Sequence, residues 1–282
     1  MTEGRSHRGT NAAKVQIGRA LLALACVFCV GPAVWQAVTS LKPDAELIRL
    51  PPLLPGEPTA SHYRAAVGEP SLPRALLNSA LVATGATVLA VGLGGLCSFA
   101  LARLPVGGKR AILAVVLCAS MFPPIAVISP LYLLVRALGL RDTLTALILT
   151  HAAYALPLTV WILTSFFRQI PTDLYRAARV DGCSPWRALA LVILPLARPA
   201  LAVAALLVFI FSWNEFMFAL TLTASEAART APVALALFPG LHEIPWGDLA
   251  AASVLVMAPV VLLAVLFQRH LVAGLTAGSV KG

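Results

Sequence analysis

The sequence predicts an all-α, polytopic integral membrane protein with six transmembrane helices. Of its 282 residues, 59% are hydrophobic and only 12% are charged, whereas soluble proteins carry about 25% charged residues. The hydrophobic residues form runs, several of which reach the roughly 20 residues that a spanning helix needs. The cations behind the net charge of +9 lie between these runs. This placement indicates orientation in a bilayer rather than a nucleic-acid surface, where cations would cluster.

The first predicted span is residues 17–38, after a polar, basic tail at residues 1–16. The apolar part of a cleaved signal peptide has about 7–15 residues. This run is longer and further spans follow it, so we expect an uncleaved helix. Cys26 and Cys29 within it have the CxxC spacing of redox or metal sites. Because no second pair or histidine adjoins them, we interpret both as small residues of an apolar helix.

Residues 39–74 are polar and contain seven prolines, a density that resists regular helix. We expect an extracytoplasmic loop here, with one short helix near residues 62–67. The second span follows at residues 75–102.

Small residues recur every four positions along the second span and therefore share one helix face. At this spacing they allow a neighbouring helix to approach closely in a membrane; the alternative is chance in a helix rich in alanine and glycine. These residues are Ala86, Ala90, Gly94 and Ser98.

The third predicted span, residues 111–135, contains Pro123, Pro124 and Pro130. Proline removes a backbone donor and kinks a helix, and membranes tolerate such a break where other groups satisfy the freed carbonyls. The pattern predicts either a broken helix beside a pathway or a bent packing helix.

Two ionisable residues lie inside the next two spans. His151, in the fourth span at residues 143–167, suits a proton relay, a pore lining or an interhelical bond. Because no chain of acids accompanies it, we favour the last two. Glu215 lies in the fifth span, residues 200–223, where insertion of an acid costs roughly 2.5–3.5 kcal/mol. It should therefore face a polar cavity or a partner group.

The sixth span, residues 248–267, precedes a tail at residues 268–282. Six spans place both termini on one side, together with fourteen of the 21 cations. The excess of cations predicts that this side is cytoplasmic. The fourteen are Arg5, Arg8, Lys14, Arg19, Arg103, Lys109, Arg110, Arg168, Arg176, Arg179, Arg187, Arg198, Arg269 and Lys281.

The sequence contains no P-loop, GxSxG, HExxH or zinc-ligand pattern. We therefore expect no cofactor or metal on this chain, no enzyme activity and no ATP hydrolysis of its own. A transporter of this kind either uses an ion gradient or obtains ATP energy from a partner. Gradient-coupled carriers show intramembrane acids and repeated halves with paired broken helices. One acid and no convincing repeat favour a partner ATPase.

The basic loop at residues 168–198 is the long polar interruption in the second half of the chain. Thr172 or Asp173 can cap one short helix, Gly182 permits a sharp turn, and Ser184 can cap a second helix that begins at Pro185. Two short helices at an angle form a projection that fits a cleft in a soluble partner. The alternative is an ordinary amphipathic interfacial helix.

These residues resemble the permease subunits of binding-protein-dependent ABC importers, in the carbohydrate class related to the maltose and trehalose systems. The family loop reads Glu-Ala-Ala, three residues, Gly, nine residues, Ile, one residue, Leu-Pro. Other matching stretches lie over essentially the whole chain beyond the N-terminal tail. The corresponding residues here are Arg176, Ala177, Ala178, Gly182, Val192, Leu194 and Pro195, with Asn78-Ser79, the MFPP run at 121–124, residues 130–132 and 139–140, the WNEF run at 213–216, and GLTAGSVKG from Gly274.

The resemblance implies a type I ABC importer permease fold, with a five-helix core at residues 75–267. It also implies a second, non-identical permease, an ATPase homodimer that binds ATP and Mg, and an extracytoplasmic sugar-binding protein. Residues 171–186 are the implied coupling helix. The implied contacts with the ATPase are Asp173, Leu174, Arg176, Ala177, Ala178, Asp181, Gly182, Ser184, Pro185 and Trp186.

Two further groups of residues are assigned roles in transport on this reading. Tyr154, Asn214 and Glu215 are expected along the translocation pathway. The loop between the last two spans is implied to reach the binding protein. The residues expected at that contact are Gly240, Leu241, His242 and Trp246.

The chain departs from the family at Arg176, where the family has a glutamate. Either the partner groove carries a compensating acid, or this position contributes little. The favoured cargo is a disaccharide or oligosaccharide such as trehalose or maltose. The competing functions are an ABC permease for another cargo, an ion-coupled carrier that works alone, and an integral-membrane enzyme.

Overall fold

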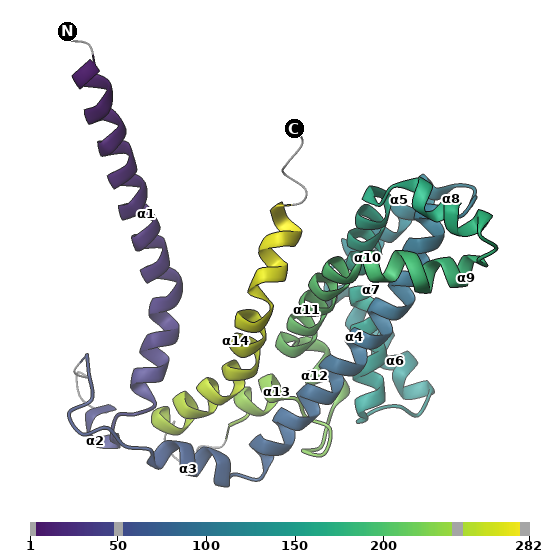
Figure 1. Ribbon diagram of the computed structural model, residues 1–282. Coiled ribbons are helices and arrows are strands. Elements are labelled where there is room, and N and C mark those ends of the chain that lie inside the picture. Colours follow the sequence, from purple (N-terminus) through teal and green to yellow (C-terminus); the bar gives the residue numbers. More distant parts are fainter. Residues whose placement is uncertain (1–3, 48–52, 239–244, 277–282) are drawn as a thin grey trace. The chain divides into compact units, whose positions relative to one another are not determined.

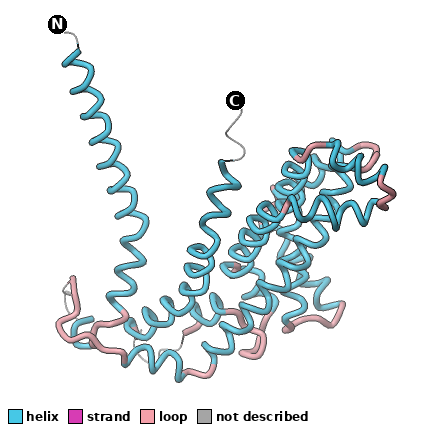
Figure 2. The backbone as a smooth tube through the Cα atoms, in the orientation of Figure 1, coloured by secondary structure: helices cyan, strands magenta, loops and turns pink. Residues whose placement is uncertain are grey.

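The computed structural model describes residues 4–47, 53–238 and 245–276, and every regular element in these ranges is a helix (Figures 1 and 2). Four described helices are long and apolar enough to span a membrane, or up to six if each of two bent helix pairs counts as one span. The predicted all-α membrane class is confirmed. The chain divides into unit 1, residues 1–68 and 239–255, and unit 2, residues 69–238 and 256–282.

The described part of unit 1 contains three helices and the start of a fourth, α14. The short helix expected near residues 62–67 is confirmed as α3. The helices are α1 (Gly4–Thr39), α2 (Asp44–Leu47), α3 (Ser61–Gly68) and α14 (Trp246–Thr276), the last of which continues into unit 2 from Val256.

A buried histidine holds unit 1 together. His62 Nδ1 lies 2.7 Å from Asp248 Oδ1, and Nε2 lies 2.8 Å from the carbonyl oxygen of Lys42. A carbonyl and an ionised carboxylate only accept hydrogen bonds, so both ring nitrogens carry protons and His62 is an imidazolium. Burial lowers the pKa of His62, but the hydrogen bonds to Asp248 and Lys42 and the nearby charge of Asp44 outweigh it and raise the pKa.

The bounds of the helices in unit 2 follow the predicted spans only in part. The fifth span, expected as one helix at 200–223, consists of two helices that meet at Glu215 and Phe216. The helices are α4 (Ser71–Arg103), α5 (Lys109–Ser120), α6 (Pro124–Ala137), α7 (Leu144–Gln169), α8 (Thr172–Val180), α9 (Pro185–Ala188), a π-helical turn (Leu189–Ile193), α10 (Leu194–Leu196), α11 (Arg198–Asn214), α12 (Met217–Leu222) and α13 (Ala231–Ala236).

The small-residue face predicted on α4 packs against α7, and the two helices lie side by side (Figure 1). A Cβ atom added at Gly94 would lie 2.7 Å from Thr159 Cγ2, closer than packed atoms approach. Ser98 donates a hydrogen bond of 3.0 Å to the carbonyl of Val160. The expected close approach of two helices is confirmed, because only a hydrogen or a small side chain fits between them.

The break predicted at the proline pair is also present. The axes of α5 and α6 meet at 93°, and Pro124 begins α6, where its missing N–H is not needed. The third span is therefore a broken helix rather than a bent one. A second bend, of 80°, separates residues 185–196 from α11.

Candidate functional site

The loop predicted to contact a soluble partner forms two short helices, α8 and α9, joined by a turn. Gly182 has a φ of +84°, which favours glycine, and Cys183 N–H closes the turn on the carbonyl of Ala178 at 2.9 Å. Ser184 caps α9 by accepting from Arg187 N–H at 3.3 Å. The cap expected at Thr172 or Asp173 is wrong, because α8 begins after Pro171 without a side-chain cap.

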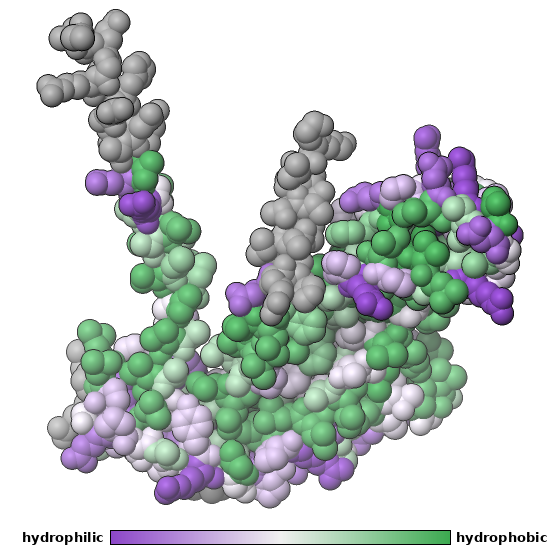
Figure 3. All heavy atoms as spheres, viewed as in Figure 1, coloured by the Kyte–Doolittle hydropathy of each residue, from purple (hydrophilic) through white to green (hydrophobic). Residues whose placement is uncertain are grey.

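The outer face of α8 and α9 exposes apolar side chains among charges, an arrangement typical of interaction sites. Val180 is 87% exposed, Trp186 67% and Leu174 43%. Hydrophilic residues gather at this end of unit 2 (Figure 3). The remaining predicted contacts are exposed or half-buried, with one exception. Asp173, Arg176, Ala177, Asp181, Gly182 and Ser184 are exposed, and Pro185 is half-buried.

The exception is Ala178, which is 7% exposed and faces its own unit. Its small size serves packing inside the chain, so the expectation that it admits a partner surface is corrected. Val180 was missed, although an apolar residue directly before an Asp-Gly turn in a polar loop was a usable signal. Asp173 Oδ1 lies 3.7 Å from Arg176 Nη1, so Arg176 has a local counter-charge that the family pattern did not indicate.

One contact joins the end of α4 to the end of α7, directly before α8, and a second joins α4 to α8. Arg103, at the end of α4, donates to the carbonyls of Phe167 and Ile170 at the end of α7. Tyr175 packs edge-on against Phe99, with ring centroids 5.9 Å apart. α8 thus contacts α4 through Tyr175 and follows directly on the end of α7 that Arg103 binds. Sequence reasoning treated Arg103 only as a topology signal.

The acid inside the fifth span lies at the junction of α11 and α12. Glu215 Oε1 accepts from Phe218 N–H at 2.8 Å and Oε2 from Ala219 N–H at 3.1 Å, so the carboxylate caps α12. His151 Nε2 on α7 lies 3.2 Å from Oε2. Glu215 has the partner group that its burial required, and His151 makes the interhelical contact that we favoured. The two are far apart in sequence, and their pairing was not predicted.

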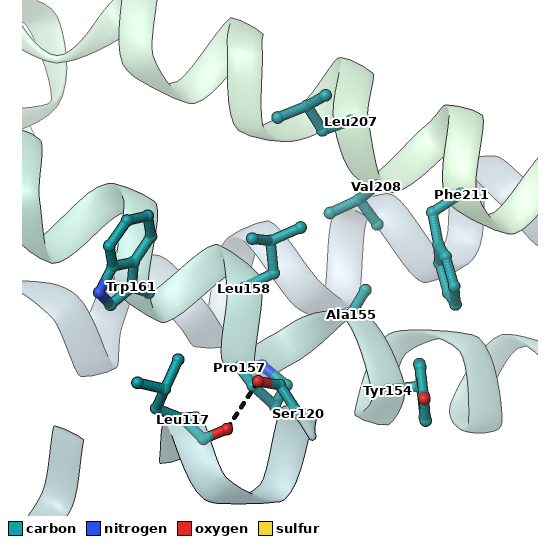
Figure 4. Close-up of a pocket in the computed structure, with 10 residues that line it drawn as sticks. All are labelled: Leu117, Ser120, Tyr154, Ala155, Pro157, Leu158, Trp161, Leu207, Val208 and Phe211. Atoms are coloured by element: carbon teal, nitrogen blue, oxygen red, sulfur yellow. Dashed lines mark hydrogen bonds between the residues drawn. The ribbon is translucent and has the colours of Figure 1, made fainter. Parts of the chain in front are cut away.

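The other two predicted pathway residues differ in placement. Tyr154 stacks on Phe211, with centroids 5.7 Å apart, and donates to the carbonyl of Phe122 at 2.9 Å. It borders a cavity of about 400 Å³ between α5, α7 and α11 (Figure 4) and a second of about 290 Å³. Asn214 is exposed and donates to the carbonyl of Ile210 within its own helix at 2.9 Å.

The lining of the larger cavity is largely apolar, and Ser120 turns its hydroxyl to the carbonyl of Leu117 at 2.7 Å (Figure 4). Such a wall suits hydrocarbon or another helix better than a hydroxyl-rich ligand. The lining residues are Leu117, Ser120, Tyr154, Ala155, Pro157, Leu158, Trp161, Leu207, Val208 and Phe211.

The family described as "Binding-protein-dependent transport system inner membrane component" matches residues 77–277. The chain belongs to this family. It is 44% identical over 89% of its length to the trehalose transport system permease protein SugB of Mycobacterium tuberculosis, covering 92% of that protein. It is 43% identical over 94% of its length to the trehalose/maltose transport system permease protein MalG of Thermococcus litoralis, covering 95%. The sulfoquinovosyl glycerol permease protein SmoH of Agrobacterium fabrum is 40% identical over 89% of this chain and 88% of its own length.

The fold of this permease is that of a solved ABC transporter. A chain of a bacterial transporter involved in the import of the polysaccharide alginate superposes with a TM-score of 0.81 over 92% of this chain and 97% of its own, at 20% identity. This likeness confirms the predicted ABC importer permease fold. The permease is an integral component of the inner membrane.

The predicted receptor contacts of the permease fall largely outside the described residues: Gly240, Leu241 and His242 lie there. Trp246 begins α14 and is 58% exposed. Its role in binding a receptor stays a prediction.

Proposed function

We propose that this permease moves a disaccharide or small oligosaccharide, of the trehalose or maltose type, across the cytoplasmic membrane as part of an ATP-driven importer. The observation that carries the proposal is the identity of 40–44%, over almost the whole chain, with permeases named for trehalose, trehalose/maltose and sulfoquinovosyl glycerol. All three cargoes are carbohydrates or glycosides. An alternative cargo within the same class is a glycoside, as in the third relative.

The ATP is hydrolysed by a partner. The residues of α8 and α9 enter a groove of an ATPase homodimer, which binds ATP and Mg, and the exposed Val180, Trp186 and Leu174 supply the apolar part of that contact. A second, non-identical permease completes the membrane part, and an extracytoplasmic sugar-binding protein delivers the cargo. Both termini lie in the cytoplasm, as the bias of fourteen cations among 21 indicates.

The test begins with the tagged permease purified in mild detergent from its native host, with co-purifying proteins identified by mass spectrometry. We expect an ATPase and a second permease. The complex is then reconstituted in liposomes with the candidate binding protein and labelled trehalose, maltose or inorganic phosphate. ATP-dependent uptake of a sugar supports the proposal. Uptake of phosphate alone would indicate a different cargo, and gradient-driven uptake by the isolated chain would overturn the importer.

A further inference from the structure

We infer that His151 and Glu215 form a positioning pair, which ties the junction of α11 and α12 to α7. Through α7 the pair links this junction to the end of unit 2 that carries α8 and α9. This inference rests on the proposed function, because it assigns a role within ATP-driven transport. The side chains of His151 and Glu215 are 0% and 7% exposed. Among the described residues, no other ion pair involves either of them.

The hydrogen-bonding roles in the pair follow from the chemistry of the groups. An ionised carboxylate only accepts, so the Nε2 that faces Glu215 carries a proton. Ser212 Oγ lies 2.7 Å from His151 Nδ1. Ser212 either donates to the neutral ring or accepts from the imidazolium, and in both cases it holds Nε2–H toward the acid. A buried acid without such a partner is strongly unfavourable.

The pair does not form a well-aligned hydrogen bond in this conformation. Nε2 and Oε2 are 3.2 Å apart, yet Nε2 has no aligned acceptor among the described residues. The two backbone N–H groups of α12, at 2.8 and 3.1 Å, hold Glu215 more closely than His151 does. The cap is therefore the tighter contact, and the link to α7 is the one that a movement between the helices changes.

The far end of α12 is held in a similar way. Asp142, in the turn after α6, accepts from Ala224 N–H at 2.8 Å and from Ser225 N–H at 3.0 Å. Its own N–H donates to the carbonyl of Leu222 at 2.9 Å. One carboxylate therefore lies near each end of α12, and Glu215 is the one that faces His151 of α7.

The route from the coupling end to the pair is a single helix. α7 stays helical from His151 to Phe167, although Pro157 between them lacks a backbone N–H; the distance is about 24 Å at 1.5 Å per residue. At Phe167 and Ile170 it is bound by Arg103, directly before α8. A movement of α8 driven by the ATPase therefore displaces His151, and through it the start of α12.

The experiment uses the full complex, reconstituted with its binding protein, and measures sugar taken up and ATP hydrolysed on the same sample. His151→Leu removes the donor of the pair and Glu215→Gln removes its negative charge, whereas His151→Gln keeps an N–H donor at the same position. Thr159→Val is the matched control, because Thr159 is a buried polar residue of α7 whose hydroxyl bonds within the helix, to Ala155. Membrane level and assembly with the partners are checked first.

We expect His151→Leu and Glu215→Gln to lower the sugar moved per ATP by roughly tenfold, the scale of leaving a buried polar group without its partner, while ATP hydrolysis changes little. His151→Gln should recover most of the ratio, and Thr159→Val should match the unaltered complex. A purely structural role predicts instead that uptake and hydrolysis fall together, and this result would overturn the inference, as would an unchanged ratio in Glu215→Gln. If His151→Leu fails to assemble, the sugar moved per ATP in the Glu215→Gln complex tests the inference instead. Failure of the unaltered complex to transport sugar contradicts the proposed function instead.

Discussion

Single residues determine the local shape of α8 and α9, the proposed coupling element, and of unit 1. Gly182 has a positive φ, and a Cβ added there would meet nothing within 4 Å. Gly247, by contrast, leaves a Cβ only 2.3 Å from the His62 ring, so His62 occupies the space beside a glycine. The turn at Gly182 was predicted from sequence, because its cause is local; the contact of His62 with Asp248 spans 186 positions and was not.

Gly182→Trp should uncouple ATP hydrolysis from transport without affecting membrane insertion. The substitution forces a side chain into a left-handed conformation, at a cost of roughly 1–2 kcal/mol, and places an indole on the proposed docking face. Sugar uptake and ATP hydrolysis in reconstituted complexes measure the effect. Gly108→Trp is the control, because Gly108 also has a positive φ, +69°, in an open turn outside α8 and α9. Normal uptake by Gly182→Trp would remove the coupling assignment.

The contact around His62 should weaken as the pH rises. The pKa of His62 in the folded protein is raised above its ordinary value of 6.5, so the imidazolium stabilises unit 1 fully below pH 6.5 and this stabilisation is lost as the pH passes the folded pKa. Asp248, Asp44 and the carbonyl of Lys42 face the ring. Hydrogen exchange of α3 at a series of pH values, corrected for intrinsic exchange, measures the loss. His62→Gln should flatten the profile; an identical profile in that variant would refute the assignment.

α4 packs against α7 through the face of small residues that the four-residue spacing predicted. Two glycines on α4 therefore differ in their surroundings. Within α4, Gly94 faces α7 and Gly92 faces outward, where a Cβ would meet nothing within 4 Å. For the third span the prolines predicted either a broken or a bent helix, and the structure has the broken one. The break at Glu215 was not predicted, because the sequence is apolar on both sides of this residue. Only the structure shows that the Glu215 carboxylate caps a second helix, α12.

Gly94→Ala should destabilise the protein, while Gly92→Ala should be neutral or stabilising. The new methyl group at Gly94 would lie 2.7 Å from Thr159 Cγ2, and overpacking of this kind costs roughly 1–3 kcal/mol. The helix gains about 0.5–1 kcal/mol when an interior glycine becomes alanine, which is the only effect expected at Gly92. Thermal unfolding in detergent compares the two variants. Equal midpoints would mean that α4 and α7 do not approach this closely.

The predicted orientation of the molecule in the membrane rests on the uneven distribution of its cations between the two sides. This distribution can be counted from the sequence and does not depend on tertiary contacts. Fourteen of 21 lie on the side assigned to the cytoplasm. The proposed coupling element falls on that side, where it would be accessible to the proposed ATPase. The loop at residues 39–74 is predicted to lie on the other side.

Cysteine labelling in sealed, right-side-out vesicles tests this orientation. In a background without the five native cysteines, Leu53→Cys should react with an impermeant maleimide, whereas Val180→Cys should react only after permeabilisation. Both positions are well exposed, at 79% and 87%, so a difference reflects sidedness rather than burial. The reverse pattern would invert the topology and exclude a cytoplasmic coupling element.

The sequence by itself determined the class, the approximate spans, the expected sidedness and the local form of the coupling element. Hydropathy, helix caps, proline and glycine act within a few residues of where they stand, so they can be interpreted along the chain. Only the tertiary structure decided that Glu215 pairs with His151, that Arg103 binds the end of α7, and that Ala178 faces inward. These contacts join separate helices, and packing alone selects which distant residue satisfies a buried charge or carbonyl.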